Sequence, residues 1–190
     1  MIKGAFDDRH LKVELDKLIQ QFNIDTIVET GTYKGWSTNV LAQTKKKIIT
    51  IEVNEELYNH AKKFNSEHEN VTFYLGSSQK VIDDVIEAQS SNKILFFLDA
   101  HWGEYWPLLD ELKVIHKKNI NSPIIIIHDF FVPDENGKAK FGYDKYGDRI
   151  LNYEYVKSHI DQIYGENKYT HYCLQESEIN AGVGIFIPNS

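Results

Sequence analysis

Two hydrophobic periods alternate along the chain. Apolar residues first recur every three or four positions, at Leu11, Leu15, Leu18 and Phe22, which is the spacing of one face of an amphipathic helix. Short runs of consecutive apolar or β-branched residues follow at intervals, over residues 26–28, 48–51, 71–75, 94–98 and 124–127. The pattern therefore predicts an N-terminal helix followed by five buried strands.

Helix signals recur between these strands. Asn54 is a good N-cap for a helix through Phe64, and Pro107 marks a helix start that is followed by acidic residues. Further helices are predicted over 35–43, around 81–86 and around 156–163, two final strands near 171–175 and 183–187, and a long loop over 133–148. Runs that are apolar on both faces suit the covered strands of a parallel sheet. We therefore expect one doubly wound α/β domain over residues 1–190.

Composition and charge narrow the function classes. The 190 residues contain 21 Lys and Arg against 28 Asp and Glu, a net charge of −7, which disfavours a fold-wide surface for nucleic acid or anionic membranes. The single Cys173 cannot form an internal disulfide. Neither an apolar signal core nor an apolar stretch long enough to span a membrane is present. These features predict a soluble, cytoplasmic domain.

Ligands of doubly wound sheets bind beyond the carboxyl ends of the strands, so the residues there are the first candidates. Gly31 and Gly35 follow the first strand, and their spacing differs from the dinucleotide pattern G-x-G-x-x-G, which disfavours NAD. Glu52 follows the second strand, where a carboxylate can accept hydrogen bonds from both ribose hydroxyls. Ser77 and Ser78 follow the third strand. An ordinary turn, a solvated acid and a helix cap are the simpler readings of these three features.

Three blocks together resemble class I S-adenosylmethionine (SAM)-dependent methyltransferases. They are the first motif E-x-G-T-x-x-G-x-S-T over 29–38, Phe-Leu-Asp-Ala-His-Trp over 97–102, and Ile-Ile-His-Asp-Phe-Phe-Val-Pro over 126–133. The resemblance implies a Rossmann-like, seven-stranded, mostly parallel sheet whose last strand is antiparallel. It also implies SAM as the cofactor and a cofactor-binding set of Glu29, Gly31, Thr32, Tyr33, Gly35, Ser37, Glu52, Ser77, Ser78 and Asp99.

A second group of polar residues follows strands four and five: Asp99, His101, His128 and Asp129. Some relatives hold a divalent metal with acids at these strand ends, so Asp99, His128 and Asp129 are the candidate metal ligands. An imidazole ligand shifts preference from Mg²⁺ toward Mn²⁺, Fe²⁺ or Zn²⁺. The alternative is a metal-free site in which Asp99 contacts the cofactor. His101 is the leading candidate for the catalytic base, followed by Asp99 and Asp129.

The resulting hypothesis is methyl transfer from SAM to a hydroxyl of a small molecule or sugar. A non-catalytic binding module, or a metal-dependent oxygenase or hydrolase on the same scaffold, is the alternative. Aromatic residues near the strand ends either wall an acceptor pocket or form a homodimer surface: Trp102, Tyr105, Trp106, Phe130, Phe131, Phe141, Tyr143 and Tyr146. The glycines and aromatics of the loop over 133–148 suit a lid that closes over the acceptor.

Overall fold

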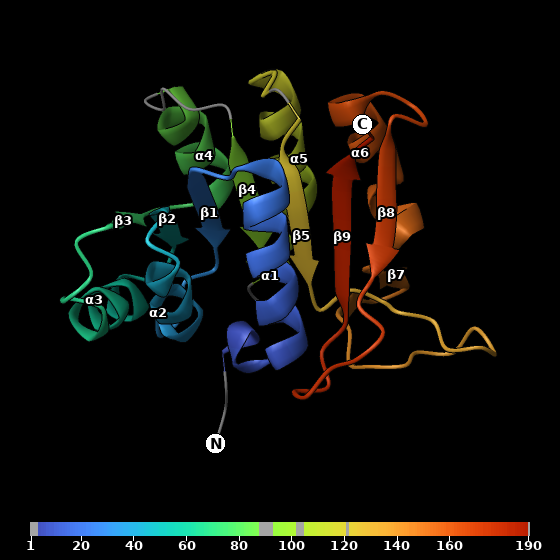
Figure 1. Cartoon of the computed structure of the whole chain (residues 1–190), viewed down its shortest axis with the longest axis horizontal. Helices are drawn as coiled ribbons and strands as arrows, with labels where there is room; N and C mark the ends of the chain where they lie inside the picture. Colours follow the sequence, from blue (N-terminus) through green and yellow to red (C-terminus); the bar gives the residue numbers. More distant parts are fainter. Residues whose placement is uncertain (1–3, 88–92, 102–104, 121, 190) are drawn as a thin grey trace.

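The computed structural model describes residues 4–87, 93–101, 105–120 and 122–189. Its centre is a seven-stranded sheet with the order β3-β2-β1-β4-β5-β9-β8. β9 runs antiparallel to both of its neighbours, β5 and β8, and the other strands run parallel to one another. The strands are β1 Thr26–Thr30, β2 Lys47–Glu52, β3 Val71–Leu75, β4 Ile94–Leu98, β5 Ile124–His128, β8 Tyr169–Cys173 and β9 Val183–Pro188. The predicted doubly wound α/β fold is thereby confirmed (Figure 1).

Helices cover both faces of the sheet (Figure 1). They are α1 Arg9–Phe22, α2 Trp36–Gln43, α3 Glu55–Phe64, α4 Ser78–Glu87, α5 Leu108–Lys117 and α6 Tyr153–Tyr164, preceded by a 3-10 turn, η1, over Ala5–Asp7. The sequence signals for helices depend on neighbouring residues only, and the predicted helices are present. Asn54 accepts the Leu57 N–H at 3.0 Å as the N-cap of α3. None of the helices within the described ranges is long and apolar enough to cross a membrane.

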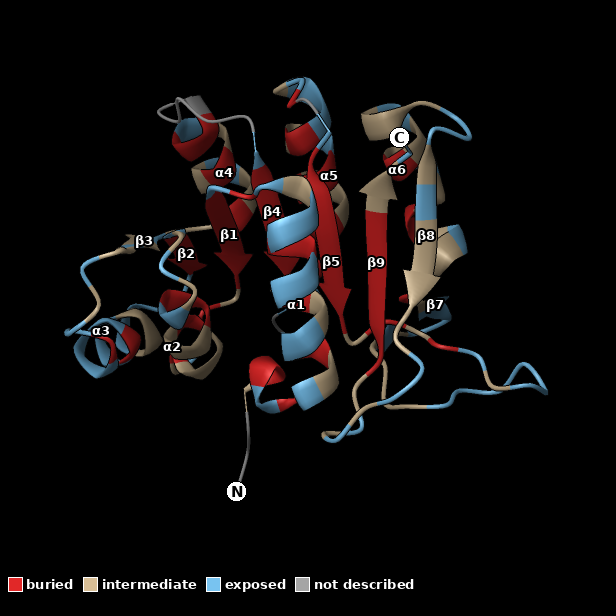
Figure 2. Ribbon diagram, viewed as in Figure 1, coloured by how far each residue is buried: buried red, intermediate tan, exposed pale blue. Residues whose placement is uncertain are grey.

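The alternation of side chains along each strand divides the core into two layers. Val28, Phe96 and Ile125 belong to the layer beneath α4, α5 and α6. Ile27, Phe97 and other residues one position out of phase belong to the layer beneath α1 and η1. All five residues of β1, β4 and β5 are buried, as the red strands of Figure 2 show. The central strands are therefore rigidly placed, and so are the residues that follow them.

The segment after β5 differs from the irregular loop that the sequence predicts. It contains a two-stranded ladder of β6 Lys145–Tyr146 and β7 Arg149–Ile150, together with a bridge between Pro133 and Ala139. Backbone bonds fix it further, because Asp144 N–H donates to the Asp129 carbonyl at 2.8 Å. The chain here is held against β5 by main-chain groups, which periodicity does not reveal.

The N-terminal turn η1 is anchored by one aromatic side chain. Phe6 is 2% exposed, and its ring lies 4.7 Å from that of Phe97 on β4. The Asp8 side chain caps α1 immediately afterwards, accepting from His10 N–H. Residues 4–8 are thus held near the carboxyl ends of the parallel strands.

We expect Phe6→Ala to lower the free energy of unfolding by about 3–5 kcal/mol, because it removes a buried ring and leaves a cavity above Phe97. Val13→Ala, on the solvent side of α1 with 62% exposure, is the matched control and should change stability by less than about 0.5 kcal/mol. Urea unfolding followed by circular dichroism measures both. Equal stabilities for the two variants would show that η1 does not pack as described.

Candidate active site

A cavity of about 750 Å³ opens at the carboxyl ends of the parallel strands. The residues that follow β1, β2, β4 and β5 line it, as do the N-terminal segment and the loop before β9. Its lining residues include Gly4, Ala5, Gly31, Thr32, Tyr33, Trp36, Ser37, Glu52, Ser78, Asp99, His101, His128, Asp129 and Ile179. Most of the residues that the sequence singles out therefore meet at one cavity.

The turn after β1 requires glycine. Gly31 has φ +80°, and a Cβ there would lie 2.5 Å from the carbonyl oxygen of Asp99, closer than real side chains approach. Gly31 N–H donates to the Ile51 carbonyl at 3.0 Å, which ties the turn to β2. The glycine thus lets the ends of β1, β2 and β4 converge, and it leaves the backbone itself as the cavity wall.

Glu52 is 7% exposed at the end of β2, and both of its carboxylate oxygens are held in place. Oε2 accepts Tyr33 N–H at 2.7 Å, and Oε1 accepts Asn54 N–H at 2.9 Å. Each oxygen retains a second lone pair for a ligand hydroxyl. The side chain is therefore oriented by the protein itself at the wall of the cavity.

Glu29 lies beneath the cavity and is fully buried. Its Oε2 accepts the hydroxyls of Thr38 at 2.5 Å and Thr50 at 2.6 Å, while Oε1 has no hydrogen-bond partner among the described residues. Burial raises the pKa of Glu29 to about 7, although the two hydroxyl bonds oppose the shift. Glu29 joins β1, α2 and β2 and is not among the described lining residues.

Some of the other candidates for cofactor binding line the cavity, and others do not. Thr32, Ser37 and Ser78 line the cavity. Ser77 is not among the described lining residues and donates to Gln79 at 2.7 Å. Gly35 is also outside the lining: it packs against α3, where a Cβ would lie 2.4 Å from the Asn65 amide nitrogen. Gly35 therefore allows α2 and α3 to pack closely.

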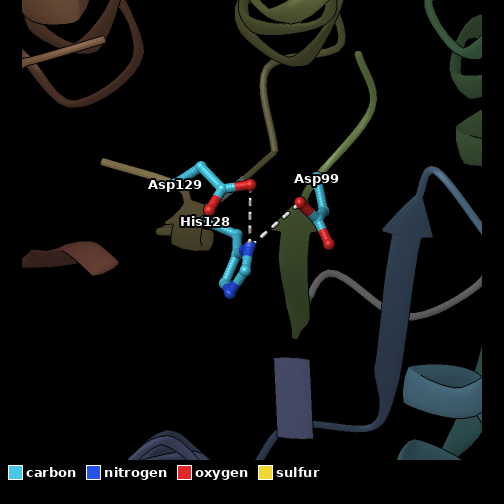
Figure 3. A group of neighbouring side chains, drawn as sticks. All are labelled: Asp99, His128 and Asp129. Atoms are coloured by element: carbon cyan, nitrogen blue, oxygen red, sulfur yellow. Dashed lines mark hydrogen bonds and ion pairs between the residues drawn. The ribbon is translucent and has the colours of Figure 1, made fainter. Parts of the chain in front are cut away.

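Asp99, His128 and Asp129 come together where β4 and β5 end (Figure 3). His128 Nδ1 lies 3.1 Å from Asp99 Oδ1 and 3.3 Å from Asp129 Oδ2, and one potential ligand atom from each residue falls within 4.8 Å of the others. Asp129 has a left-handed backbone with φ +51°, which is unfavourable for a residue other than glycine. The three donors form a compact set that fits a divalent cation.

The electrostatics of this set demand a positive charge between the carboxylates. Burial on its own lowers the pKa of His128, but Asp99 and Asp129 outweigh burial and hold it well above its usual value. Burial likewise raises the pKa of Asp129, and the two histidines, His128 and His101, reverse that shift and lower it. A proton on His128 Nδ1 therefore lies between the two carboxylates, in the place that a metal ion would take if one were bound.

His101 lies on the outer side of the same cavity. Its Nδ1 is 3.8 Å from Asp144 Oδ2, and its side chain is 47% exposed. His101, Asp144 and Asp129 form a second group of potential ligand atoms within 4.8 Å. Burial raises the pKa of Asp144 despite the opposing effect of His101. Asp144 is therefore an acidic neighbour of His101, and nothing in the sequence predicts this proximity.

The structure corrects the expectation that aromatic residues form a common rim. Trp106 is 8% exposed, and its ring lies 4.5 Å from Tyr146 and 5.3 Å from Tyr155 inside the core. Phe130 is 1% exposed. Both are core residues, and Tyr146 is occupied by its packing on Trp106. Trp102 lies outside the described residues.

Sequence reasoning missed several contributors to the site, among them Asp144, Ala5 and Ile179. Asp144 follows β5 at a distance of many residues, so only the return of the loop brings it near His101. Ala5 and Ile179 are small or apolar residues in segments without a recognisable motif. Asp144 lies between Tyr143 and Tyr146 in the loop over 133–148, which the sequence already marks as a candidate lid, and this position is a signal that could have drawn attention to it.

A family model and solved structures both match this chain. The family model described as O-methyltransferase matches residues 9–121. That range contains β1 to α5, and therefore the Gly31 turn, Glu52 and Asp99. No curated protein sequence matches the chain.

Solved structures are similar over nearly the whole chain. An O-methyltransferase from Bacillus cereus in complex with S-adenosylhomocysteine (SAH) has a TM-score of 0.68 at 16% identity, covering 95% of this chain and 81% of that one. The O-methyltransferase TomG from Streptomyces achromogenes, involved in tomaymycin synthesis and solved with SAM, has a TM-score of 0.66 at 15% identity, covering 95% and 80%. At these identities the likeness establishes the fold.

We expect Glu29→Gln to gain stability relative to the wild type as pH rises from about 4.5 to about 7. The folded wild type keeps its proton up to about pH 7, whereas the unfolded chain loses it near 4.5, so the wild type loses stability across this range. The neutral amide avoids that loss, which amounts to about 3 kcal/mol. Urea unfolding at pH 5 and pH 8 measures it. A difference that does not change with pH would contradict a protonated Glu29.

Proposed function

The chain belongs to the O-methyltransferase family, and on that premise we propose that it transfers the methyl group of SAM to a hydroxyl of a small molecule or sugar. One observation carries the proposal: a single cavity contains both the Gly31 turn with Glu52 and the cluster of Asp99, His128 and Asp129. Family membership favours methyl transfer over a non-catalytic module and over oxygenase or hydrolase chemistry.

SAM supplies an electrophilic methyl group on a positively charged sulfur. In this proposal Glu52 accepts hydrogen bonds from the ribose hydroxyls, because its carboxylate is already fixed by Tyr33 and Asn54. Ser78 contacts the adenine side, and the turn at Gly31 places its backbone against the methionine end. Asp99 and His128, which line the same cavity, would then border the reacting end of the cofactor.

Asp99, His128 and Asp129 would hold a divalent cation, either Mg²⁺ or one of Mn²⁺, Fe²⁺ and Zn²⁺, which imidazole favours. Such an ion polarises a hydroxyl and lowers its pKa. His101 accepts the hydroxyl proton at its Nε2, since Asp144 lies beside Nδ1. Asp99 and Asp129 are weaker candidates for the base because both already contact His128.

We expect Glu52→Ala to weaken SAM binding about 10- to 100-fold, the value of a hydrogen bond to a charged group. Glu56→Ala, an exposed acid in the first turn of α3, is the matched control and should leave the affinity unchanged. Isothermal titration calorimetry with SAM measures both. The same dissociation constant for both variants would remove Glu52 from the cofactor site.

Asp129→Asn should abolish methyl transfer and Mn²⁺ binding while SAM affinity stays within about threefold, because Asp129 lies at the metal end of the cavity. Asp148→Asn, an exposed acid in the following loop, is the control. Methyl-labelled SAM and a panel of monosaccharides and phenols provide the assay. Full activity in excess chelator, with no metal found by elemental analysis, would leave His101 and the acids as a metal-free site.

A further inference from the structure

Asp8 is a buried carboxylate that lies outside the cavity lining and serves two separate elements. It is 3% exposed. Its Oδ1 accepts the backbone N–H groups of His10 at 2.9 Å and Leu11 at 3.3 Å, which caps α1. Its Oδ2 accepts the Ser177 hydroxyl and the Glu178 N–H, each at 2.8 Å. One carboxylate thus joins the N-terminal helix to the loop between β8 and β9.

The loop side of this contact forms part of the cavity wall. Ser177 Oγ also accepts Ala181 N–H at 3.1 Å, which closes residues 177–181 into a turn. Ile179 lies within the turn and lines the cavity. On its other side the turn is bound to the loop after β5, because Gly142 N–H donates to the Asn180 carbonyl at 2.9 Å and Gly182 N–H donates to the Gly142 carbonyl at 2.9 Å. Its attachment to the N-terminal segment depends on side-chain bonds.

The helix side of the contact leads to the same cavity. Asp8 N–H donates to the Ala5 carbonyl at 3.2 Å, and Ala5 N–H donates to Ser37 Oγ at 3.0 Å. Ala5 and Ser37 both line the cavity. Asp8 therefore stands between two lining segments that are far apart in the sequence.

The contacts that accompany Asp8 are weaker. Arg9 pairs with Glu178 at 3.6 Å, and His10 pairs with Glu176 at 3.0 Å, but both acids are exposed. Exposed ion pairs of this kind add little to stability. Hydrogen bonds to a buried carboxylate are stronger, so among these contacts Asp8 contributes most to holding the turn against the N-terminal segment.

We propose that Asp8 is a positioning residue of the methyl-transfer site, which holds the 177–181 turn against the N-terminal segment so that Ile179 and Ala5 form one wall of the occupied cavity. The inference rests on the proposed function, since it assigns that wall to enclosing the cofactor and acceptor. Such a wall excludes water from the reacting groups.

Asp8→Asn separates the two roles of this residue. An amide has a single acceptor oxygen, so it can serve the α1 N-cap or the turn, but not both. Asparagine is as good an N-cap as aspartate, so α1 is retained. Its amide nitrogen would face the Glu178 N–H, which is also a donor, so the turn loses that bond and is held more weakly. Asp8→Ala removes both attachments, Ser177→Ala weakens the turn without touching the cap, and Glu176→Ala is the control on an exposed neighbouring pair.

The test is amide hydrogen exchange by mass spectrometry, with and without SAH. In the wild type we expect SAH to slow exchange in residues 31–35 and in 174–182. In Asp8→Asn the 174–182 segment should exchange at least tenfold faster, and SAH should no longer slow it, while its effect on 31–35 persists. Ser177→Ala should give a smaller change of the same kind, and Glu176→Ala none.

Each outcome decides between the claims. If SAH slows 174–182 equally in the wild type and in Asp8→Asn, Asp8 has a merely structural role and the proposal is overturned. The same holds if SAH protects 31–35 in the wild type but never 174–182, because the turn is then no wall of the occupied site. Absence of any SAH effect on 31–35 in the wild type would instead overturn the proposed function.

Discussion

The close approach of β1 and β4 at their carboxyl ends is the constraint on which the site depends. The two strands pair in parallel up to Thr30 and Leu98, and both chains then have to turn at the same edge. Gly31 allows this, because its missing Cβ leaves room for the Asp99 carbonyl. A larger residue would push Asp99 away from His128. The Glu52 side of the cavity and the side formed by Asp99, His128 and Asp129 therefore both depend on this backbone contact.

The pKa values of the carboxyl groups near the cavity are shifted in two opposite directions. Burial raises the pKa values of Glu29 and Glu111 to about 7, so that both approach neutrality beneath the site. Asp129 is instead kept charged by the neighbouring imidazoles, in spite of its burial. Negative charge is therefore retained at Asp129, where a cation or an acceptor proton would bind, and it is reduced at Glu29 and Glu111, which are buried.

Periodicity and capping predicted the fold because they depend on local sequence. Asn54 is the N-cap of α3 as expected, and the Gly31 turn lies directly after β1, where the chain changes direction. Long-range return of the chain could not be predicted in this way. Asp144 reaches His101 only because its backbone bonds to that of Asp129. Trp106 reads as a rim residue, yet packing against Tyr146 buries it, since solvent exposure depends on partners elsewhere in the chain.

The bond between Asp8 and Ser177 spans 169 positions of sequence, and it has a consequence for how the protein is made. Strands β1 to β5 can pair while the chain is still emerging from the ribosome, since each contact there is comparatively local. The cavity wall cannot close until residues 177 and 178 have left the exit tunnel. Contacts of such high order form late and slowly. A nascent chain can therefore pair β1 to β5 first, whereas β8, β9 and the turn between them join the fold last.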